Sequence, residues 1–285
     1  MRQRWVSVRG LRLCLCEWGP PSGPQVLILH GWLDQAAAWD RTARRLGADG
    51  WRVMALEHRG HGHSAHAPQG STYHFTEYIA DVDALLRTET DSPIALVGHS
   101  MGGTIAAQVA ALRPAAVRHL TLIEGLGPPR VSDEDAITQL RTHLDHLSRP
   151  PPVKSVASVA AGAERIRRLN PALPLDEAMR LASRVLLPAP DGSLQWRWDP
   201  MHRTRAAVAF DLDRFLLLLR QVACPTALLF GKQSWYLQLP DLEERISCIA
   251  DVQINTLLDT GHSPHMEAPD LLAETLQAAL SGAVR

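Results

Sequence analysis

The sequence lacks the features that mark several specialised classes of protein. Its 285 residues carry a net charge of −1, so overall electrostatics gives no argument for a nucleic acid or an anionic membrane as a partner. No apolar run approaches the roughly 20 residues that a membrane-spanning helix requires. We therefore expect no nucleic acid partner and no membrane span. The choice between a monomer and a dimer stays open.

Cysteine is scarce, and its spacing excludes the usual paired motifs. None of the four cysteines forms a C-x-x-C pair, which removes a common sequence signal for a metal or redox site. Cys14 and Cys16 alternate with Leu13 and Leu15, so both thiols are expected on one face of a strand, in a packing role. The first residues lack the apolar segment of a signal peptide. A reduced, cytoplasmic setting is the simplest expectation.

The chain does contain an alternation of strand-like and helix-like segments. Short apolar runs such as residues 26–29 are typical of strands buried on both faces of a sheet, and helical periodicity separates most of them. This alternation favours right-handed crossovers and a mostly parallel sheet. Strands are expected at residues 4–8, 11–18, 26–29, 51–56, 93–97, 117–123, 225–230 and 252–258.

The alternation stops between residues 125 and 214. This segment is helical in pattern, irregular and interrupted by prolines, and Ser132 followed by three acidic residues indicates a helix start. An insertion after the C-terminal end of a strand can cover the crevice in which α/β proteins bind ligands. We expect residues 1–124 and 215–285 to form one core, with residues 125–214 inserted as a helical cap.

The most informative motif is Gly98-His99-Ser100-Met101-Gly102, which lies between an apolar run and a helix-like one. A G-x-S-x-G sequence in this setting is typical of the nucleophile elbow, a strained turn that lifts the serine hydroxyl above the edge of the sheet. Glycines flank the serine because strand and helix approach too closely there for side chains. The alternative is a glycine-rich turn without chemistry.

A serine hydroxyl is a weak nucleophile until a base takes its proton, and that base needs a carboxylate to orient it. His262 follows the last expected strand and precedes the last helix, so it is expected on a loop at the same sheet edge as Ser100. His265 falls in the first turn of that helix and is interpreted as a packing or capping residue. Ser100 and His262 are therefore the candidate nucleophile and base.

Four motifs in this order resemble the α/β-hydrolase superfamily, and the resemblance covers nearly the whole chain outside the insertion. The motifs are His30-Gly31-Trp32, residues 57–64, residues 98–102 and Gly261-His262. Residues 30–34 and 196–200 are further similar to its serine hydrolase-like branch. The resemblance implies an α/β-hydrolase fold with a mostly parallel eight-stranded sheet, a Ser-His-acid triad and no cofactor.

The acid of the triad is where the sequence departs from the family pattern. In most relatives it stands about three residues after the glycine that matches Gly231. Here that position is Ser234, which cannot stabilise a protonated imidazole by charge. Some relatives carry the acid at the end of the preceding strand, which points to Glu124. A carboxylate there is costly unless it is hydrogen-bonded, and orienting the base would satisfy it. Asp241 and Asp259 remain alternatives.

The oxyanion hole should consist of two backbone N–H groups, because fixed donors stabilise the developing negative charge without reorganisation. One candidate is the N–H of Met101, directly after the nucleophile. The resemblance assigns the other to Trp32, on the loop after the third strand. The Trp32 indole could also wall the acyl pocket or belong to the core.

The histidines at 61, 63 and 66 form an H-x-H-x-x-H pattern that invites a metal interpretation. Three histidines can bind zinc, but the metallo-β-lactamase version of the motif has an aspartate where Ala65 stands. Arg59 and Ser64 are interpreted as groups that hold the turn. We expect no metal.

The sequence thus predicts a serine hydrolase that cleaves a small or medium acyl substrate, with a carboxylic ester as the default. Thioester, lactone and carbon–carbon cleavage stay open, because the same triad serves all of them. Dehalogenase and epoxide hydrolase chemistry is disfavoured, since those relatives carry an aspartate at the position of Ser100. The alternative of another class is a non-catalytic receptor for a small molecule, which the missing acid at Ser234 keeps open.

Overall fold

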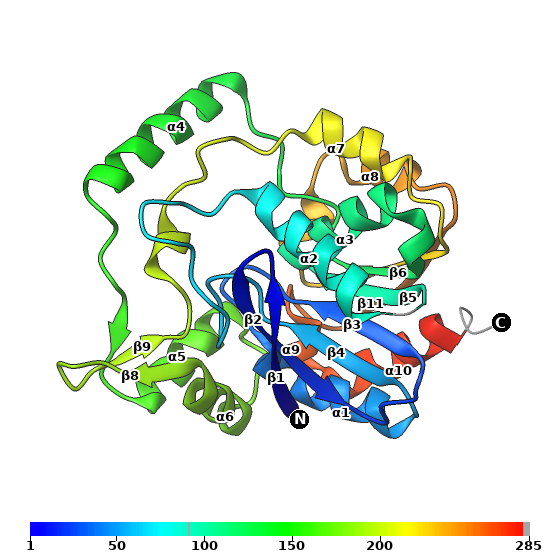
Figure 1. Ribbon diagram of the computed structural model, residues 1–285, viewed down its shortest axis with the longest axis horizontal. Coiled ribbons are helices and arrows are strands. Elements are labelled where there is room, and N and C mark those ends of the chain that lie inside the picture. Colours follow the sequence, from blue (N-terminus) through cyan, green and yellow to red (C-terminus); the bar gives the residue numbers. More distant parts are fainter. Residues whose placement is uncertain (91, 282–285) are drawn as a thin grey trace.

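An eight-stranded sheet forms the centre of the protein (Figure 1). The computed structural model describes residues 1–90 and 92–281, and of residues 253–257 only the backbone. The first two pairs of neighbouring strands are antiparallel and all others are parallel, which confirms the expected architecture. In spatial order the strands are β1 (Arg2–Val8), β2 (Leu11–Trp18), β4 (Arg52–Leu56), β3 (Gln25–Leu29), β5 (Ile94–His99), β6 (Val117–Ile123), β10 (Thr226–Gly231) and β11 (Val252–Leu258).

Side chains alternate between the two faces of the sheet, as the pleat of a strand requires. In β2, Leu13 and Leu15 belong to the apolar cluster on one face, and Cys14 and Cys16 belong to the cluster on the other. All four side chains are fully buried. The expected packing role of the two cysteines is confirmed.

Helices cover both faces of the sheet (Figure 1). One face carries α2 (Phe75–Glu89), α3 (Met101–Leu112), η2 (Pro114–Ala116), α7 (Leu212–Leu219), η4 (Trp235–Gln238) and α8 (Leu242–Ser247). The other face carries η1 (Ala36–Trp39), α1 (Asp40–Ala48), α9 (Pro264–Glu267) and α10 (Pro269–Ser281). Burial on both faces explains why the central strands are almost wholly apolar.

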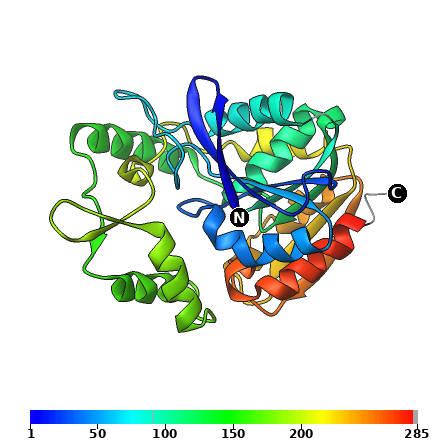
Figure 2. The same ribbon diagram turned by 60° about the horizontal axis from the view of Figure 1, so that its bottom comes forward.

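Between β6 and α7 the chain forms a lobe beside the sheet (Figure 2). The lobe contains α4 (Asp133–Ser148), β7 (Ser155–Val156), α5 (Val159–Leu169), α6 (Leu175–Val185), β8 (Leu186–Pro188), β9 (Leu194–Trp196) and η3 (Pro200–Arg203). The Ser132 side chain caps α4 by accepting a hydrogen bond from the N–H of Asp135 at 3.1 Å, so the predicted helix start is confirmed. The expected boundary between insertion and core, after residue 214, falls inside α7. The chain returns to the core slightly earlier, since both Leu212 and Phe215 pack there.

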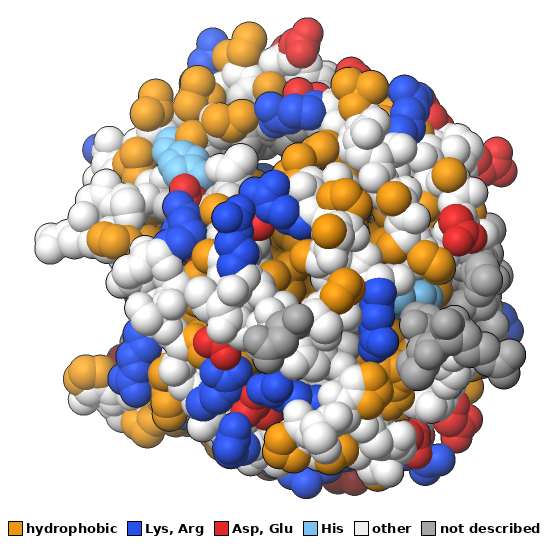
Figure 3. All heavy atoms as spheres, turned by 45° about the vertical axis from the view of Figure 1, so that its right-hand side comes forward, with side chains coloured by type: hydrophobic (Ala, Val, Ile, Leu, Met, Phe, Trp, Pro, Cys, Tyr) orange, Lys and Arg blue, Asp and Glu red, His pale blue; other side chains and the backbone are white. Residues whose placement is uncertain are grey.

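None of the helices within the described residues is both long and apolar enough to cross a bilayer. The face of the molecule in Figure 3 intersperses basic, acidic and hydrophobic side chains. This mixture agrees with the net charge of −1.

A buried ion pair holds the turn that follows β4. Arg59 donates to both carboxylate oxygens of Asp81, in α2, at 2.6 Å each, and the two residues are 6% and 1% exposed. The Ser64 hydroxyl donates to the carbonyl of Glu57 at 2.5 Å and accepts from the N–H of Cys14 at 2.8 Å. Arg59 and Ser64 therefore hold the turn, as the sequence indicated.

We predict that Arg59→Ala lowers the free energy of unfolding by about 3 kcal/mol, because it removes the main partner of a buried carboxylate. Arg9 also reaches Asp81, at 3.2 Å, which keeps the loss from being larger. Arg87→Ala is the control: it removes an exposed partner of Asp83 and should cost less than about 1 kcal/mol. Urea unfolding measures both, and equal losses would contradict the prediction.

Candidate active site

Ser100 stands at the junction of β5 and α3 in a strained backbone conformation. Its φ of +51° lies in the left-handed region, which L-residues other than glycine seldom adopt. A Cβ on Gly98 would lie 2.5 Å from the carbonyl oxygen of Gly102, so strand and helix could not approach as they do with any larger residue. The N–H of Ser100 donates to the carbonyl of Ile123 at 2.9 Å. This geometry is that of a nucleophile elbow.

His262 follows β11 and faces the serine. Its Nε2 lies 3.1 Å from the Ser100 Oγ, and its Nδ1 is hydrogen-bonded to the Oε2 of Glu124. A carboxylate at Nδ1 favours the tautomer that carries its proton there, which leaves the Nε2 lone pair toward the hydroxyl. The structure thus brings together three residues that are remote in the sequence.

Glu124 is fully buried and has a φ of +48° directly after β6. Its carboxylate accepts hydrogen bonds from the N–H of Gly231 at 2.7 Å and from the hydroxyl of Ser234 at 2.6 Å, in addition to the contact with His262. A buried carboxylate without such donors would be strongly unfavourable. With them, it is a fixed negative charge beside the imidazole.

Ser234 lies where most relatives carry the acid, and it contacts Glu124 instead of replacing it. The acid therefore reaches the imidazole from the neighbouring strand. The two other candidate acids have different partners: Asp241 pairs with Arg245 at 2.9 Å, and Asp259 accepts from Gln233 at 3.0 Å. Sequence reasoning identified Ser234 as a departure from the family pattern but missed its role as a hydrogen-bond donor. Only the fold brings it close to Glu124.

His99 directly precedes Ser100 and contacts the loop that carries His262. Its Nε2 is 2.7 Å from the carbonyl oxygen of His262 and donates to it. Burial, with the neighbouring His265 and His262, lowers the pKa of His99 well below its ordinary value, so the ring is neutral and has one N–H to give. The sequence offered no signal for this contact beyond the position of His99 inside the motif.

A second buried pair connects the loop after β3 to the helix after the base. The His265 Nε2 lies 3.1 Å from the Asp34 Oδ2, and the ring stacks on Trp39 with the centroids 4.4 Å apart. Burial opposes ionisation of Asp34, but the hydrogen bond and charge of His265 outweigh it, so the pKa of Asp34 is lowered. His265 is therefore a packing residue, as the sequence suggested, and Asp34 is its unforeseen partner.

Both candidate oxyanion donors belong to segments that lie beside Ser100. Met101 is the first residue of α3, and the N–H groups of a first helical turn have no partner within the helix. Trp32 follows Gly31, and a Cβ on Gly31 would lie 3.4 Å from the Ser100 Cβ, so this loop passes directly beside the serine. The Trp32 side chain is 55% exposed and does not belong to the core.

Two neutral histidines hold the loop that carries Trp32. His30 Nδ1 donates to the carbonyl of Gly31 at 2.7 Å. His61 Nδ1 donates to the carbonyl of Arg59 at 3.1 Å, and its Nε2 accepts from the N–H of Leu33 at 3.2 Å. Burial lowers the pKa of both imidazoles, that of His61 far below its ordinary value. Uncharged rings can donate with one nitrogen and accept with the other, as these bonds require.

The histidines of the H-x-H-x-x-H pattern have different partners. His61 bonds to the backbone as described, His63 Nδ1 lies 3.1 Å from the Oε2 of Glu57, and His66 Nδ1 lies 3.4 Å from Asp199. The three rings therefore do not converge on one point, and zinc binding by this pattern is not supported.

Two cavities meet at the nucleophile, and both are lined by Ser100, Trp32 and Trp235. The apolar chamber, of about 620 Å³, lies against the lobe and is lined mainly by apolar side chains, among them Ile166, Leu169, Leu181, Val185, Trp196 and Met266. The arginine chamber, of about 850 Å³, is lined by Arg130, Arg205 and Arg214 together with Phe210 and Phe215. Sequence reasoning missed Trp235, which lines both chambers.

Comparison with known proteins agrees with this fold. The sequence model of a family described as "alpha/beta hydrolase fold" matches residues 24–151. A serine hydrolase-like protein of Danio rerio is 28% identical over 283 residues, which cover 95% of this chain and 84% of the relative. A serine hydrolase-like protein of Dictyostelium discoideum is 27% identical, over 90% of this chain and 75% of the relative.

A solved structure titled "Thioesterase Domain From Curacin Biosynthetic Pathway" has a TM-score of 0.89 and 33% sequence identity to this chain. The alignment covers 98% of this chain and 99% of that one. The similarity thus extends through the inserted lobe as well as the sheet. The chain belongs to the α/β-hydrolase superfamily, and it is similar in sequence to serine hydrolase-like proteins.

Proposed function

We propose that this protein is a serine hydrolase that cleaves a small or medium acyl substrate through an acyl-enzyme, most readily a carboxylic ester. The observation that carries the proposal is the alignment of three groups. The His262 Nε2 lies 3.1 Å from the Ser100 hydroxyl while its Nδ1 bonds to the buried Glu124. A positioned base, itself oriented by a carboxylate, is what makes a serine hydroxyl nucleophilic.

The reaction then proceeds in two halves. His262 takes the proton of Ser100 as the oxygen attacks the substrate carbonyl, and Glu124 stabilises the imidazolium that forms. The N–H groups of Met101 and Trp32 hold the negative oxygen of the tetrahedral intermediate. His262 returns the proton to the leaving group, and a water molecule activated by the same base releases the acid from Ser100. No cofactor enters either half.

The two chambers support an acyl substrate with unlike ends. The acyl chain lies in the apolar chamber, because burying it there removes apolar surface from water. The leaving group lies in the arginine chamber, where polar groups find donors. The lobe formed by residues 125–214 acts as a cap, since its helices α5 and α6 line the apolar chamber. Thioesters and lactones fit the same scheme, and one of the similar structures is named a thioesterase domain.

A non-catalytic receptor is the weaker alternative. It was suggested by the absence of an acid at Ser234. The hydrogen bonds of Glu124 to both Ser234 and His262 favour an enzyme, because they supply the charge that Ser234 lacks. A receptor would have no need of a strained serine beside an oriented base.

We predict that Ser100→Ala lowers hydrolysis of p-nitrophenyl esters by a factor of ~10⁶ and abolishes labelling by a fluorophosphonate probe, because the nucleophile is lost. Ser263→Ala is the matched control, since Ser263 lines the same chamber but its hydroxyl forms no hydrogen bond to a base among the described residues, and it should retain the label. An unlabelled wild-type protein would favour the receptor.

We predict that Glu124→Gln lowers kcat by a factor of up to ~10⁴, because an amide cannot stabilise the imidazolium and favours the wrong tautomer. Asp259→Asn is the control, as this alternative acid contacts only Gln233 among the described residues. Steady-state kinetics on one ester measures both. Near-native turnover of the Glu124 variant would remove this residue from the mechanism.

We predict that Leu181→Trp shifts the preference toward shorter acyl chains, because a larger side chain fills part of the apolar chamber. The expected change is a loss of roughly 10-fold or more in kcat/KM for octanoyl esters and little change for acetyl esters. Leu175→Trp, on the exposed side of the same helix, is the control. Thioesters of the same acyl groups identify the preferred leaving group. An equal loss of kcat/KM for all acyl lengths would show that the acyl chain does not lie in the apolar chamber.

A further inference from the structure

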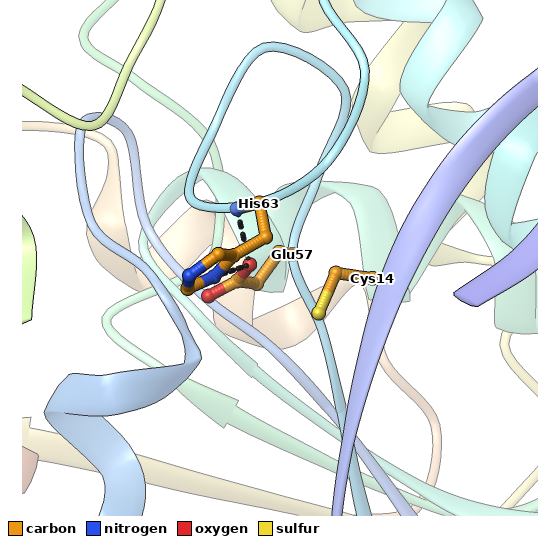
Figure 4. Close-up of side chains that lie close together, drawn as sticks. All are labelled: Cys14, Glu57 and His63. Atoms are coloured by element: carbon orange, nitrogen blue, oxygen red, sulfur yellow. Dashed lines mark hydrogen bonds and ion pairs between the residues drawn. The ribbon is translucent and has the colours of Figure 1, made fainter. Parts of the chain in front are cut away.

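Apart from the two chambers, three potential metal ligands gather between β2 and the turn after β4. Cys14 comes from β2, Glu57 directly follows β4, and His63 lies on the turn. Figure 4 shows the three side chains directed toward one another. One ligand atom from each lies within 4.8 Å of the other two. None of the three lines the apolar or the arginine chamber.

We propose that Cys14, Glu57 and His63 form a zinc-binding site. Thiolate, imidazole and carboxylate are the three side-chain ligands that zinc takes, at about 2.0–2.3 Å from the ion. Ligand atoms around such an ion are therefore roughly 3–4 Å apart. The His63 Nδ1 and the Glu57 Oε2 already lie 3.1 Å apart. Magnesium and calcium are excluded as occupants because they prefer oxygen ligands only.

The charge balance around Glu57 favours a cation. The side chain is 1% exposed. Its Oε2 accepts from the N–H of His63 at 2.5 Å, and in the described part of the chain its only ion-pair partner is the His63 imidazole. A buried carboxylate without a fixed positive charge is unfavourable. Two arginines line the same small cleft as Glu57, but neither neutralises its charge. Arg184 pairs with Asp40 at 3.1 Å, and Arg197 donates to a backbone carbonyl.

A small cleft gives an ion access to the cluster. It measures about 290 Å³ and is lined by Gln3, Cys16, Glu57 and His63, among others. The Gln3 Nε2 lies 3.3 Å from the His63 Nδ1 and 3.9 Å from the Cys16 Sγ. The fourth ligand is a water molecule in the cleft. Binding converts the Cys14 thiol to a thiolate and releases one proton to solvent.

A zinc ion at this site would stabilise the fold and would not take part in hydrolysis. It would connect β2 to the turn of residues 57–66. The same turn carries His61, which holds the loop of Trp32 through Leu33. Zinc would stabilise that arrangement in the folded state. The proposal departs from the expectation that the chain has no metal, which rested on Ala65 standing where the histidine motif has an aspartate and on the turn being explained by the fold.

The test is a cobalt titration of the full, tag-free chain after treatment with a chelator. Cobalt(II) takes the place of zinc and gives a thiolate-to-cobalt absorption band only when a cysteine binds it. We expect one cobalt per chain with such a band, displaced by zinc. Zinc at 100 times its Kd should raise the Tm by roughly 5 °C.

Four variants assign the ligands. Cys14→Ser should lose the absorption band, and His63→Gln should weaken binding by roughly 10-fold or more. Cys224→Ser and His66→Gln remove a buried thiol and an exposed imidazole elsewhere, and both should bind as the wild type does. His63 is 32% exposed, so its variant reports on the site even where Cys14→Ser does not fold.

Three results would overturn the proposal. The first is the absence of stoichiometric binding to the wild type. The second is a thiolate band that persists in Cys14→Ser. The third is binding that survives His63→Gln but is lost in His265→Asn, which would assign the metal to the separate cluster of Asp34, His99 and His265. These readouts need no enzyme activity, so they are independent of the proposed hydrolysis.

Discussion

The arrangement of the site depends on one buried carboxylate, that of Glu124. A negative charge at zero exposure must be met by donors, and here they come from three separate segments: Gly231 at the end of β10, Ser234 before η4, and His262 after β11. Satisfying the charge therefore draws the ends of β6, β10 and β11 together. The same contacts orient the imidazole toward Ser100. The contacts that satisfy the buried carboxylate during folding are therefore the same ones that orient His262.

A second set of contacts comes from neutral, buried histidines. Burial keeps the pKa values of His30, His61 and His99 low, so each ring has one nitrogen that donates, and its other nitrogen can accept. Their bonds run to backbone groups of Gly31, Arg59, Leu33 and His262. These bonds connect the loop after β3 to the loop after β4, and the end of β5 to the loop after β11. A preorganised site needs such support, because its donors must not move when charge develops.

Much of this could be predicted from sequence because the relevant signals are local. The alternation of apolar strands and helices indicated the sheet, and G-x-S-x-G between them indicated the strained serine. Glu124 was found from the family resemblance, because some relatives carry the acid at the end of this strand, and the cost of an unsatisfied carboxylate there supported the assignment. The partners of these residues could not be predicted. Ser234 donates to Glu124 across 110 positions of sequence, and no periodicity encodes a contact at that separation.

The inserted lobe also combines features that the sequence predicts with features that it does not. Its prolines and helical spacing marked residues 125–214 as an insertion, yet the return to the core within α7 depends on Leu212 and Phe215 reaching the core cluster on that face of the sheet. The two chambers likewise arise from side chains of many elements meeting around Ser100. The sequence by itself determined the fold class and marked Ser100 and His262 as the candidate nucleophile and base, because these signals lie in adjacent residues and in periodic burial. Only the tertiary structure decided which groups surround them, because burial and hydrogen bonding are satisfied by proximity in space and not by order along the chain.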